Sequence, residues 1–138
     1  MLYSLSVKQP FASQIAIGKK TIEWRSKPFK YRCDLVICAS ASPKPKTPTG
    51  QPLPTGCAIA IVTVVDCRPF TKADLAAACC LDYLEYIYGP PTGWAWILEN
   101  PREVEPVPVK GIVAPWPWKG PELVLAPGYH AGIGFIKE

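Results

Sequence analysis

The stretch LSVKQPFASQIAIGKKTIEWRS, residues 5–26, predicts a strand, a short helix and a second strand in immediate succession. Its first residues have strand composition. Residues 9–20 are typical of a short helix, because Pro10 suits the first helical turn and Gly18 followed by lysines suits its end. Residues 21–26 then show the alternation of β-branched and aromatic residues that is typical of a strand. An opening of this kind indicates a mixed fold.

The rest of the chain predicts further short strands and one longer helix. The helix is expected over 71–89, where Thr71 and Asp74 form a capping-box pattern and Gly89 ends the segment. Seventeen prolines exclude a helix bundle. This mixture, without strict alternation of strands and helices, predicts an α+β fold: a small β-barrel of five to six strands with two main flanking helices. Beyond the opening, strands are expected over 34–40, 57–67, 93–104, 107–113 and 128–138, of which 57–67 is the most apolar and the best candidate for a central strand.

The length and charge of the chain limit its organisation and its partners. A chain of 138 residues fits one domain, 1–138, which is large enough to bury a core of its own. Residues 43–56 hold five prolines and two glycines, which predicts an irregular loop; loops of that length are often functional. The net charge of +4 favours phosphate-bearing partners, but only weakly.

Cysteine and histidine usage argues against a metal site or a disulfide framework. The six cysteines include no Cys-x-x-Cys pair and His130 is the only histidine, so we expect free thiols, no metal and no cofactor. The N-terminus lacks a secretory pattern, and no apolar run reaches the roughly 18 residues of a membrane span. The sequence therefore predicts a cytoplasmic protein that needs neither a membrane nor an obligate protein partner.

The segment TIEWRS, residues 21–26, brings opposite charges together. Strand alternation places Glu23 and Arg25 on one face, with Ile22 and Trp24 on the core side. Lys20 precedes the strand, and its long stem can reach the face that carries Glu23. This face is either the floor of a site or an exposed edge strand with ion pairs that contribute about 0–1 kcal/mol each. Spacing alone favours the exposed edge.

Two blocks of sequence, residues 5–26 and residues 94–118, resemble the ASCH superfamily, relatives of the PUA-like RNA-binding barrels. Downstream, WAWILENPREVEPVPVKGIVAPWPW, residues 94–118, is similar to the EOLA-like branch of that superfamily, with its Asn-Pro-Arg turn and tryptophan pair. The resemblance spans nearly the whole chain. In the first block, the signature is carried by Gln9, Pro10, Phe11, Ala12, Gly18, Lys20, Glu23 and Arg25.

The resemblance implies a PUA-like barrel with a cleft beside the segment from Gly18 to Arg25. Members of the superfamily are associated with RNA binding; some are small amidohydrolases that remove an acyl group from the exocyclic amine of cytidine, and at least one resembles a ribonuclease. Lys20 matches the catalytic lysine of the amidohydrolases. Glu23 stands where those enzymes have a threonine, so an attacking threonine hydroxyl is not expected here.

Physical chemistry suggests roles for the three charged residues. A neighbouring carboxylate favours the ammonium form of Lys20, which could steady an oxyanion or protonate a leaving amine, while Glu23 activates water and Arg25 organises the pair. The expected substrate is an N4-acylated cytidine or other cytosine derivative. A non-catalytic RNA-binding module and a ribonuclease are the alternatives.

Further residues are candidates for substrate binding or for a second carboxylate. Aromatic rings could stack on a base, and an asparagine could read its edge, although such rings more often pack in a core and Asn100 precedes a proline whose turn it can stabilise itself. A second carboxylate could come from Asp82 or Glu85, one helical turn apart. The substrate-binding candidates are Ser6, Gln9, Phe11, Asn100 and Trp116.

Overall fold

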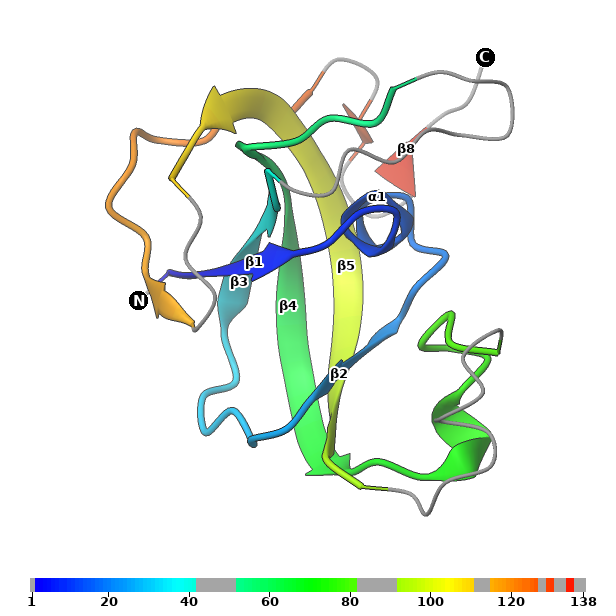
Figure 1. Ribbon diagram of the computed structural model, residues 1–138. Coiled ribbons are helices and arrows are strands. Elements are labelled where there is room, and N and C mark those ends of the chain that lie inside the picture. Colours follow the sequence, from blue (N-terminus) through cyan, green and yellow to red (C-terminus); the bar gives the residue numbers. More distant parts are fainter. Residues whose placement is uncertain are drawn as a thin grey trace.

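Within the residues that it describes, the computed structural model contains a curled, six-stranded main sheet, a two-stranded sheet and one short α-helix (Figure 1). The structure describes residues 2–41, 52–81, 92–110 and 115–126, together with the backbone of 129–130 and 134–135. The strands of the main sheet are β1 (Tyr3–Val7), β2 (Ile22–Arg25), β3 (Asp34–Ala39), β4 (Cys57–Pro69), β5 (Trp94–Pro108) and β6 (Trp116–Pro117).

The strand order in this sheet is β2-β5-β4-β3-β1-β6. β1 runs parallel to β3, and the other neighbouring pairs are antiparallel. The parallel pair requires a crossover between β1 and β3, and this crossover carries α1 (Phe11–Ala16) and β2. The order places β4 at the centre of the sheet, as the apolar run over 57–67 predicts, and the six strands agree with the predicted number.

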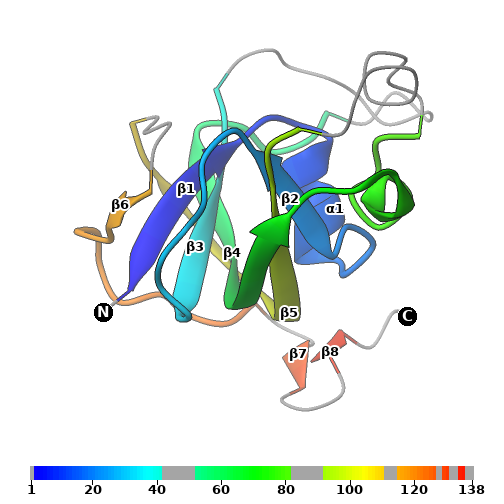
Figure 2. The ribbon, with the colours of Figure 1, turned by 90° about the horizontal axis from the view of Figure 1, so that it is seen from below.

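Helix α1 covers the inner side of the curled sheet. Its buried residues Ala12, Ile15 and Ala16 belong to the main core, and the helix packs on β3, β4 and β5 (Figure 2). Gly18, with a positive φ of 81°, turns the chain out of the helix and toward β2. The short helix predicted over 9–20 is therefore confirmed, with narrower limits.

The main core fills the inside of the curl with the inward side chains of β1, β3 and β4. Trp96 of β5 is 2% exposed, and its ring stacks on Phe29 at 4.9 Å between centroids. The outer face of β3 is buried as well, because Val36 and Cys38 lie under a second cluster that includes Trp118 and Leu123. All six cysteines are free, and burial raises the pKa of the Cys38 thiol to about 11, so it stays protonated.

The long helix predicted over 71–89 is not formed in the part that the structure describes. Residues 72–74 form a single 3₁₀ turn, η1 (Lys72–Asp74), which does begin with the predicted capping box. Further turns follow, and Cys79 has a positive φ of 56°, which an α-helix does not allow. The carbonyl of Ala77 accepts hydrogen bonds from the amides of Thr21 and Ile22, so tertiary partners take a group that a helix would use internally. Residues 82–91, including the predicted carboxylates Asp82 and Glu85, lie outside the described residues.

The two strands predicted over 93–104 and 107–113 are one strand as far as the structure describes them. β5 continues through Pro101 and Pro106, because both prolines lie at interruptions of its register with β4, where no ladder hydrogen bond is lost. At the C-terminal end, the single strand predicted over 128–138 is replaced by two short antiparallel strands, β7 (Tyr129–His130) and β8 (Gly134–Phe135). Most of the predicted loop over 43–56 lies outside the described residues, which resume at Pro52.

Candidate active site

A cleft of about 330 Å³ lies where β2 approaches β1, strands that are far apart in the order of the sheet. Arg25 spans this seam: its guanidinium Nη2 donates a hydrogen bond of 2.9 Å to the carbonyl of Ser6 on β1. We call the hollow the Lys20 cleft. Its principal lining residues are Ser6, Lys8, Phe11, Lys20, Glu23 and Arg25.

Lys20 is buried at the base of this cleft, with 3% of its surface exposed. Its Nζ donates a hydrogen bond of 2.5 Å to the carbonyl of Ala78 and lies 3.4 Å from Oε1 of Glu23. The same nitrogen lies 5.0 Å from the centre of the Phe11 ring, within the range of a cation–π contact. Since an ammonium has three donors, two protein oxygens leave one N–H for a ligand or for the ring.

Glu23 is held between two cations. It is 7% exposed; Arg25 donates a hydrogen bond to its Oε2 from Nε at 3.0 Å, and Nη2 of Arg25 forms an ion pair with the same oxygen at 2.9 Å. Among the contacts within the described residues, Oε1 has the longer one, with Lys20, so this oxygen is the better placed of the two to accept a hydrogen bond from water. The exposed edge strand that spacing alone favours is therefore not what the structure shows, because Lys20 and Glu23 are both buried.

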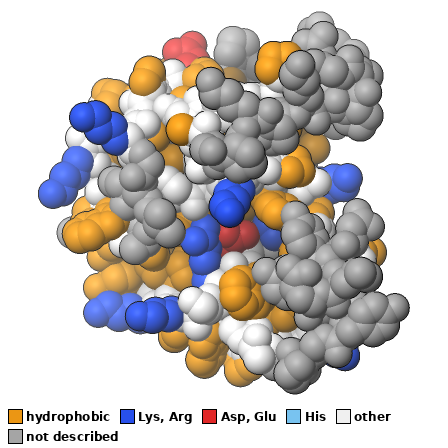
Figure 3. All heavy atoms as spheres, viewed as in Figure 1, with side chains coloured by type: hydrophobic (Ala, Val, Ile, Leu, Met, Phe, Trp, Pro, Cys, Tyr) orange, Lys and Arg blue, Asp and Glu red, His pale blue; other side chains and the backbone are white. Residues whose placement is uncertain are grey.

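The charge of the Lys20 cleft is positive among the lining residues that the structure describes. Lys8, Lys20 and Arg25 outnumber the single carboxylate of Glu23. Figure 3 shows basic side chains next to an acidic one near the middle of one face of the molecule. A buried ammonium and guanidinium fixed by hydrogen bonds are suited to stabilise negative charge that develops in a reaction, because they need little reorganisation.

Two of the predicted binding residues lie in the Lys20 cleft and two lie away from it. Ser6 and Phe11 line it. Gln9 is buried, and its side-chain amide bonds Ser13 of α1 and the carbonyl of Pro54, which ties the helix to the end of the 43–56 segment. Asn100 has a positive φ of 53°, lines a separate hollow on the other side of Lys20, and its carbonyl accepts a hydrogen bond from Arg102.

Trp116, the fifth predicted binding residue, lies beside a different hollow of about 300 Å³. This second hollow adjoins the Lys20 cleft, because Ser6 lines both. The structure thus brings Lys20, Glu23, Arg25, Ser6 and Phe11 together in one cleft. Trp116 lines the neighbouring hollow instead.

Two groups of the site, Lys8 and the carbonyl of Ala78, are not among those predicted from the sequence. The sequence does contain a signal for Lys8. Ser4, Ser6 and Lys8 are each two positions apart, so strand alternation places all three on the same face, and Lys8 lines the cleft. The Ala78 carbonyl gives no signal in the sequence, because its role depends on a turn that only the tertiary contacts form. In the described part of the chain, no three His, Cys, Asp or Glu side chains converge as metal ligands, and no helix is long and apolar enough to cross a membrane.

Comparison with known proteins identifies the family. The profile of the ASCH domain matches residues 5–108, which include the Lys20 cleft, most of β1 and all of β2 to β5. The chain belongs to the ASCH family. The search of curated proteins found no match to this ASCH domain.

Solved structures support the same fold. The ASCH protein of Zymomonas mobilis superposes with a TM-score of 0.58 at 19% identity, over 78% of this chain and 73% of that protein. A variant of the same protein with a serine replaced by alanine gives 0.57 at 19% identity, over 78% and 74% of the two chains. A variant with a tyrosine replaced by phenylalanine gives 0.55 at 19%, over 78% and 75%. At this identity the similarity concerns the fold alone.

Proposed function

We propose that this ASCH domain is a metal-independent amidohydrolase that removes the acyl group from N4-acylated cytidine or a related cytosine derivative. The observation that supports the proposal most is the buried pair of Lys20 Nζ and Glu23 Oε1, 3.4 Å apart in a cleft, with Phe11 beside them. A cleft of about 330 Å³ is at the lower end of the range for small-molecule sites, about 300–1,000 Å³, and so suits a ligand of nucleoside size.

In the proposed reaction, Glu23 Oε1 accepts the proton of a water that attacks the amide carbonyl carbon. The carbonyl oxygen becomes an oxyanion, which the Lys20 ammonium stabilises. The C–N bond then breaks, the electron pair goes to N4 of cytosine, and N4 receives the proton held by Glu23 or one from Lys20. The products are the carboxylic acid and the cytosine amine. Where N4 takes its proton from Lys20, transfer of the proton from Glu23 to Lys20 restores the starting state, and the acid product releases its own proton to solvent.

Arg25 positions the base in this reaction. Its hydrogen bond and its ion pair with Oε2 of Glu23 leave Oε1 directed at the water, and its bond to the Ser6 carbonyl fixes the guanidinium across the seam between β1 and β2. Phe11 offers a ring against which a pyrimidine can stack, for which base–aromatic contacts contribute about 1–3 kcal/mol.

The test is hydrolysis of N4-acetylcytidine by the purified full chain in the presence of a chelator. We expect Glu23→Gln to lower kcat about 100- to 10,000-fold, the range for loss of a general base, and Lys20→Ala to lower it comparably. Lys19→Ala is the matched control, because it removes an exposed lysine next to Lys20 and should leave kcat unchanged. Unfolding curves of each variant exclude simple loss of the fold.

Two results would overturn the proposal. Turnover that survives both Lys20→Ala and Glu23→Gln would show that other residues catalyse the reaction. Absence of turnover by the wild type with acetyl and longer acyl groups would favour the second candidate, a non-catalytic RNA-binding module.

The excess of positive charge in the Lys20 cleft supports that second candidate. A binding module would lose affinity for RNA steeply as the salt concentration rises, whereas hydrolysis of an uncharged nucleoside would depend on it only weakly. A ribonuclease, in which Lys20 and Arg25 would stabilise the scissile phosphate, would reveal itself by cleavage of unmodified RNA in the same assays.

A further inference from the structure

The second hollow lies on the side of β1 away from the Lys20 cleft and is built around β6. It has a volume of about 300 Å³, and we call it the Trp116 hollow. β6 pairs with the start of β1, where Tyr3 faces Pro117 and Ser4 faces Trp116, and the Ser4 hydroxyl donates to the Trp116 carbonyl at 3.1 Å. Its lining includes Ser6, Lys110, Trp116, Trp118 and Lys119.

The two tryptophans of this hollow differ in what holds them. Trp118 donates its indole N–H to the carbonyl of Pro121 at 2.9 Å and packs on the outer face of β3. Trp116 is 54% exposed, and β6 holds it through its backbone. A large aromatic ring that is open to solvent and carried by a paired strand is a suitable stacking surface, because only its two side-chain torsions have to be ordered when a ligand stacks on it.

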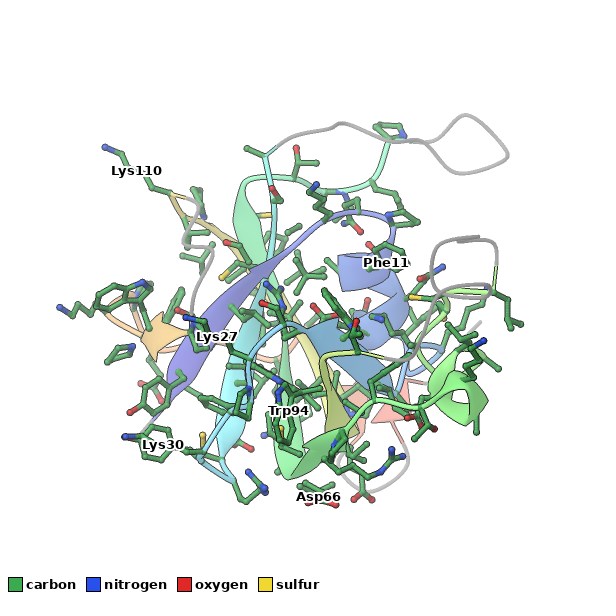
Figure 4. The ribbon with its side chains drawn as sticks, turned by 60° about the horizontal axis from the view of Figure 1, so that its bottom comes forward. Phe11, Lys27, Lys30, Asp66, Trp94 and Lys110 are labelled. Atoms are coloured by element: carbon green, nitrogen blue, oxygen red, sulfur yellow. The ribbon has the colours of Figure 1, made fainter. Side chains whose placement is uncertain are left out.

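Charge indicates what kind of ligand would stack there. Lys110 and Lys119 line the hollow and are exposed, and none of the described residues that line it is acidic. Figure 4 shows Lys110, Lys27 and Lys30 on the side of the molecule where β6 lies. An aromatic platform with basic side chains on either side is complementary to a nucleobase joined to phosphates.

The position of Ser6 connects this hollow with the Lys20 cleft. Ser6 lines both, and its carbonyl accepts the hydrogen bond of Arg25. The two hollows therefore meet at one residue of β1. A free nucleoside is too small to occupy both, whereas a strand of two or more nucleotides could place one base in each.

We propose that the Trp116 hollow stacks a nucleobase of single-stranded RNA next to the cytidine in the Lys20 cleft, with Lys110 and Lys119 near its phosphates. The stacking subsite stands by itself. Its consequence for catalysis, that the substrate is an acylated cytidine within RNA, rests on the proposed function.

The first measurement is binding of a fluorescently labelled single-stranded octaribonucleotide to the full chain, followed by anisotropy. Trp116→Ala is expected to weaken binding about 5- to 100-fold, the equivalent of losing one stacked base, and Trp116→Phe should keep most of the affinity. Replacing Lys110 or Lys119 by alanine should lower the slope of log affinity against log salt by about 0.7 for each phosphate that the variant no longer neutralises.

Lys72→Ala is the matched control for the lysine variants. Lys72 is exposed and belongs to η1, whose neighbours Phe70 and Leu75 pack with Ile22 of β2, at the opposite edge of the sheet from β6. Lys72→Ala removes the same charge as the other lysine variants, but far from the Trp116 hollow. The affinity for RNA and its salt slope should therefore both stay at the wild-type values. An equal loss in Lys72→Ala and Lys119→Ala would show that only net charge matters and would overturn the proposal.

The second measurement compares hydrolysis of free N4-acetylcytidine with hydrolysis of the octamer carrying one N4-acetylcytidine. The ratio of kcat/KM for the octamer to that for the nucleoside should fall about 5- to 100-fold in Trp116→Ala. If neither substrate is hydrolysed, the proposed function fails, while the anisotropy measurement still tests the stacking subsite. Octamer affinity unchanged by Trp116→Ala, or binding of a labelled proline-rich peptide in place of RNA, would overturn the subsite.

Discussion

At the scale of single residues, the site consists of charges that the fold removes from water. Lys20 and Glu23 are 3% and 7% exposed, although each belongs to a residue type that is rarely buried without a partner. Lys20 and Arg25 are each hydrogen-bonded to a backbone carbonyl as well as paired with Glu23. Such pairing offsets the cost of desolvation, and it fixes the geometry that a reaction would need.

Arg25 allows the positioning of Glu23 to be tested with a substitution that keeps the charge. We expect Arg25→Lys to lower kcat for N4-acetylcytidine about 10- to 100-fold. A compact ammonium cannot reproduce the planar arrangement in which Arg25 bonds and pairs with Oε2 and also bonds the Ser6 carbonyl. Steady-state kinetics of the wild type, of Arg25→Lys and of a control variant check this. Arg32→Lys is the control, since Arg32 is partly exposed and pairs with Asp66 at 3.6 Å, so kcat should not change. An unchanged kcat in Arg25→Lys would contradict the role of Arg25.

At the scale of elements, the segment after β4 shows that a correctly predicted helix start need not be followed by the predicted helix. The capping box of Thr71 and Asp74 is present, yet the turns that follow serve β2 and Lys20 instead of a long helix. Arg68 at the end of β4 donates two hydrogen bonds of 2.8 Å to Asp74 and so fastens η1 to the sheet. The position of the Ala78 carbonyl, and with it the base of the Lys20 cleft, depends on this anchoring.

Asp74 makes the stability of this element depend on pH. Arg68 and then Thr71 lower the pKa of Asp74 to about 2, against the effect of burial. Because this lies below the ordinary value of about 3.9, the stabilisation is complete above pH ~4 and is lost as the pH falls toward 2. We expect Asp74→Asn to reduce the free energy of unfolding by on the order of 2 kcal/mol at neutral pH, and by much less near pH 2.

Urea unfolding of the wild type and of Asp74→Asn at several pH values measures this difference. Asp66→Asn is the matched control, because the Asp66 side chain is 57% exposed and its pair with Arg32 is long at 3.6 Å. A difference between wild type and Asp74→Asn that stays constant from neutral pH to pH ~2 would show that the carboxylate charge is not the cause.

At the scale of the whole molecule, the chain adds a covering segment beyond the part that matches the family profile. The profile ends at residue 108, but residues 115–126 lie over the outer face of the sheet. Val104 pairs with Leu125, and the amides of Glu105 and Trp118 bond the carbonyls of Val124 and Leu2. This segment also supplies Trp116 and Lys119 to the Trp116 hollow, so it contributes both to stability and to the proposed RNA subsite.

The two tryptophans of this segment should separate these contributions. We expect Trp118→Ala to lower the free energy of unfolding by about 2–4 kcal/mol, because it uncovers Val36 and Cys38. Trp116→Ala, which removes the same side chain from an exposed position, should cost less than about 1 kcal/mol. Chemical denaturation of both variants checks this, and equal losses would mean that Trp116 is a packing residue as well.

The local pattern of the sequence determined most of the strands, α1 and the residues that carry the site. Alternation and turn residues act over a few positions, so they predict β1 to β4 and place Glu23 and Arg25 on one face. Resemblance to the ASCH superfamily then pointed to Lys20 and to a cleft, against the exposed edge that spacing alone favours.

Several features depend on contacts between residues far apart in the sequence, and only the tertiary structure decided these. Register with β4 decided that β5 passes through its prolines at bulges, and the pairing of Thr21 and Ile22 with Ala77 decided that the chain after η1 turns instead of continuing as a helix. The burial of Lys20 depends on the carbonyl of Ala78, 58 residues further along the chain. The packing of the complete sheet determines which backbone groups become partners. Because a backbone group can form the same hydrogen bond whatever its side chain, such a partner leaves no pattern in the sequence.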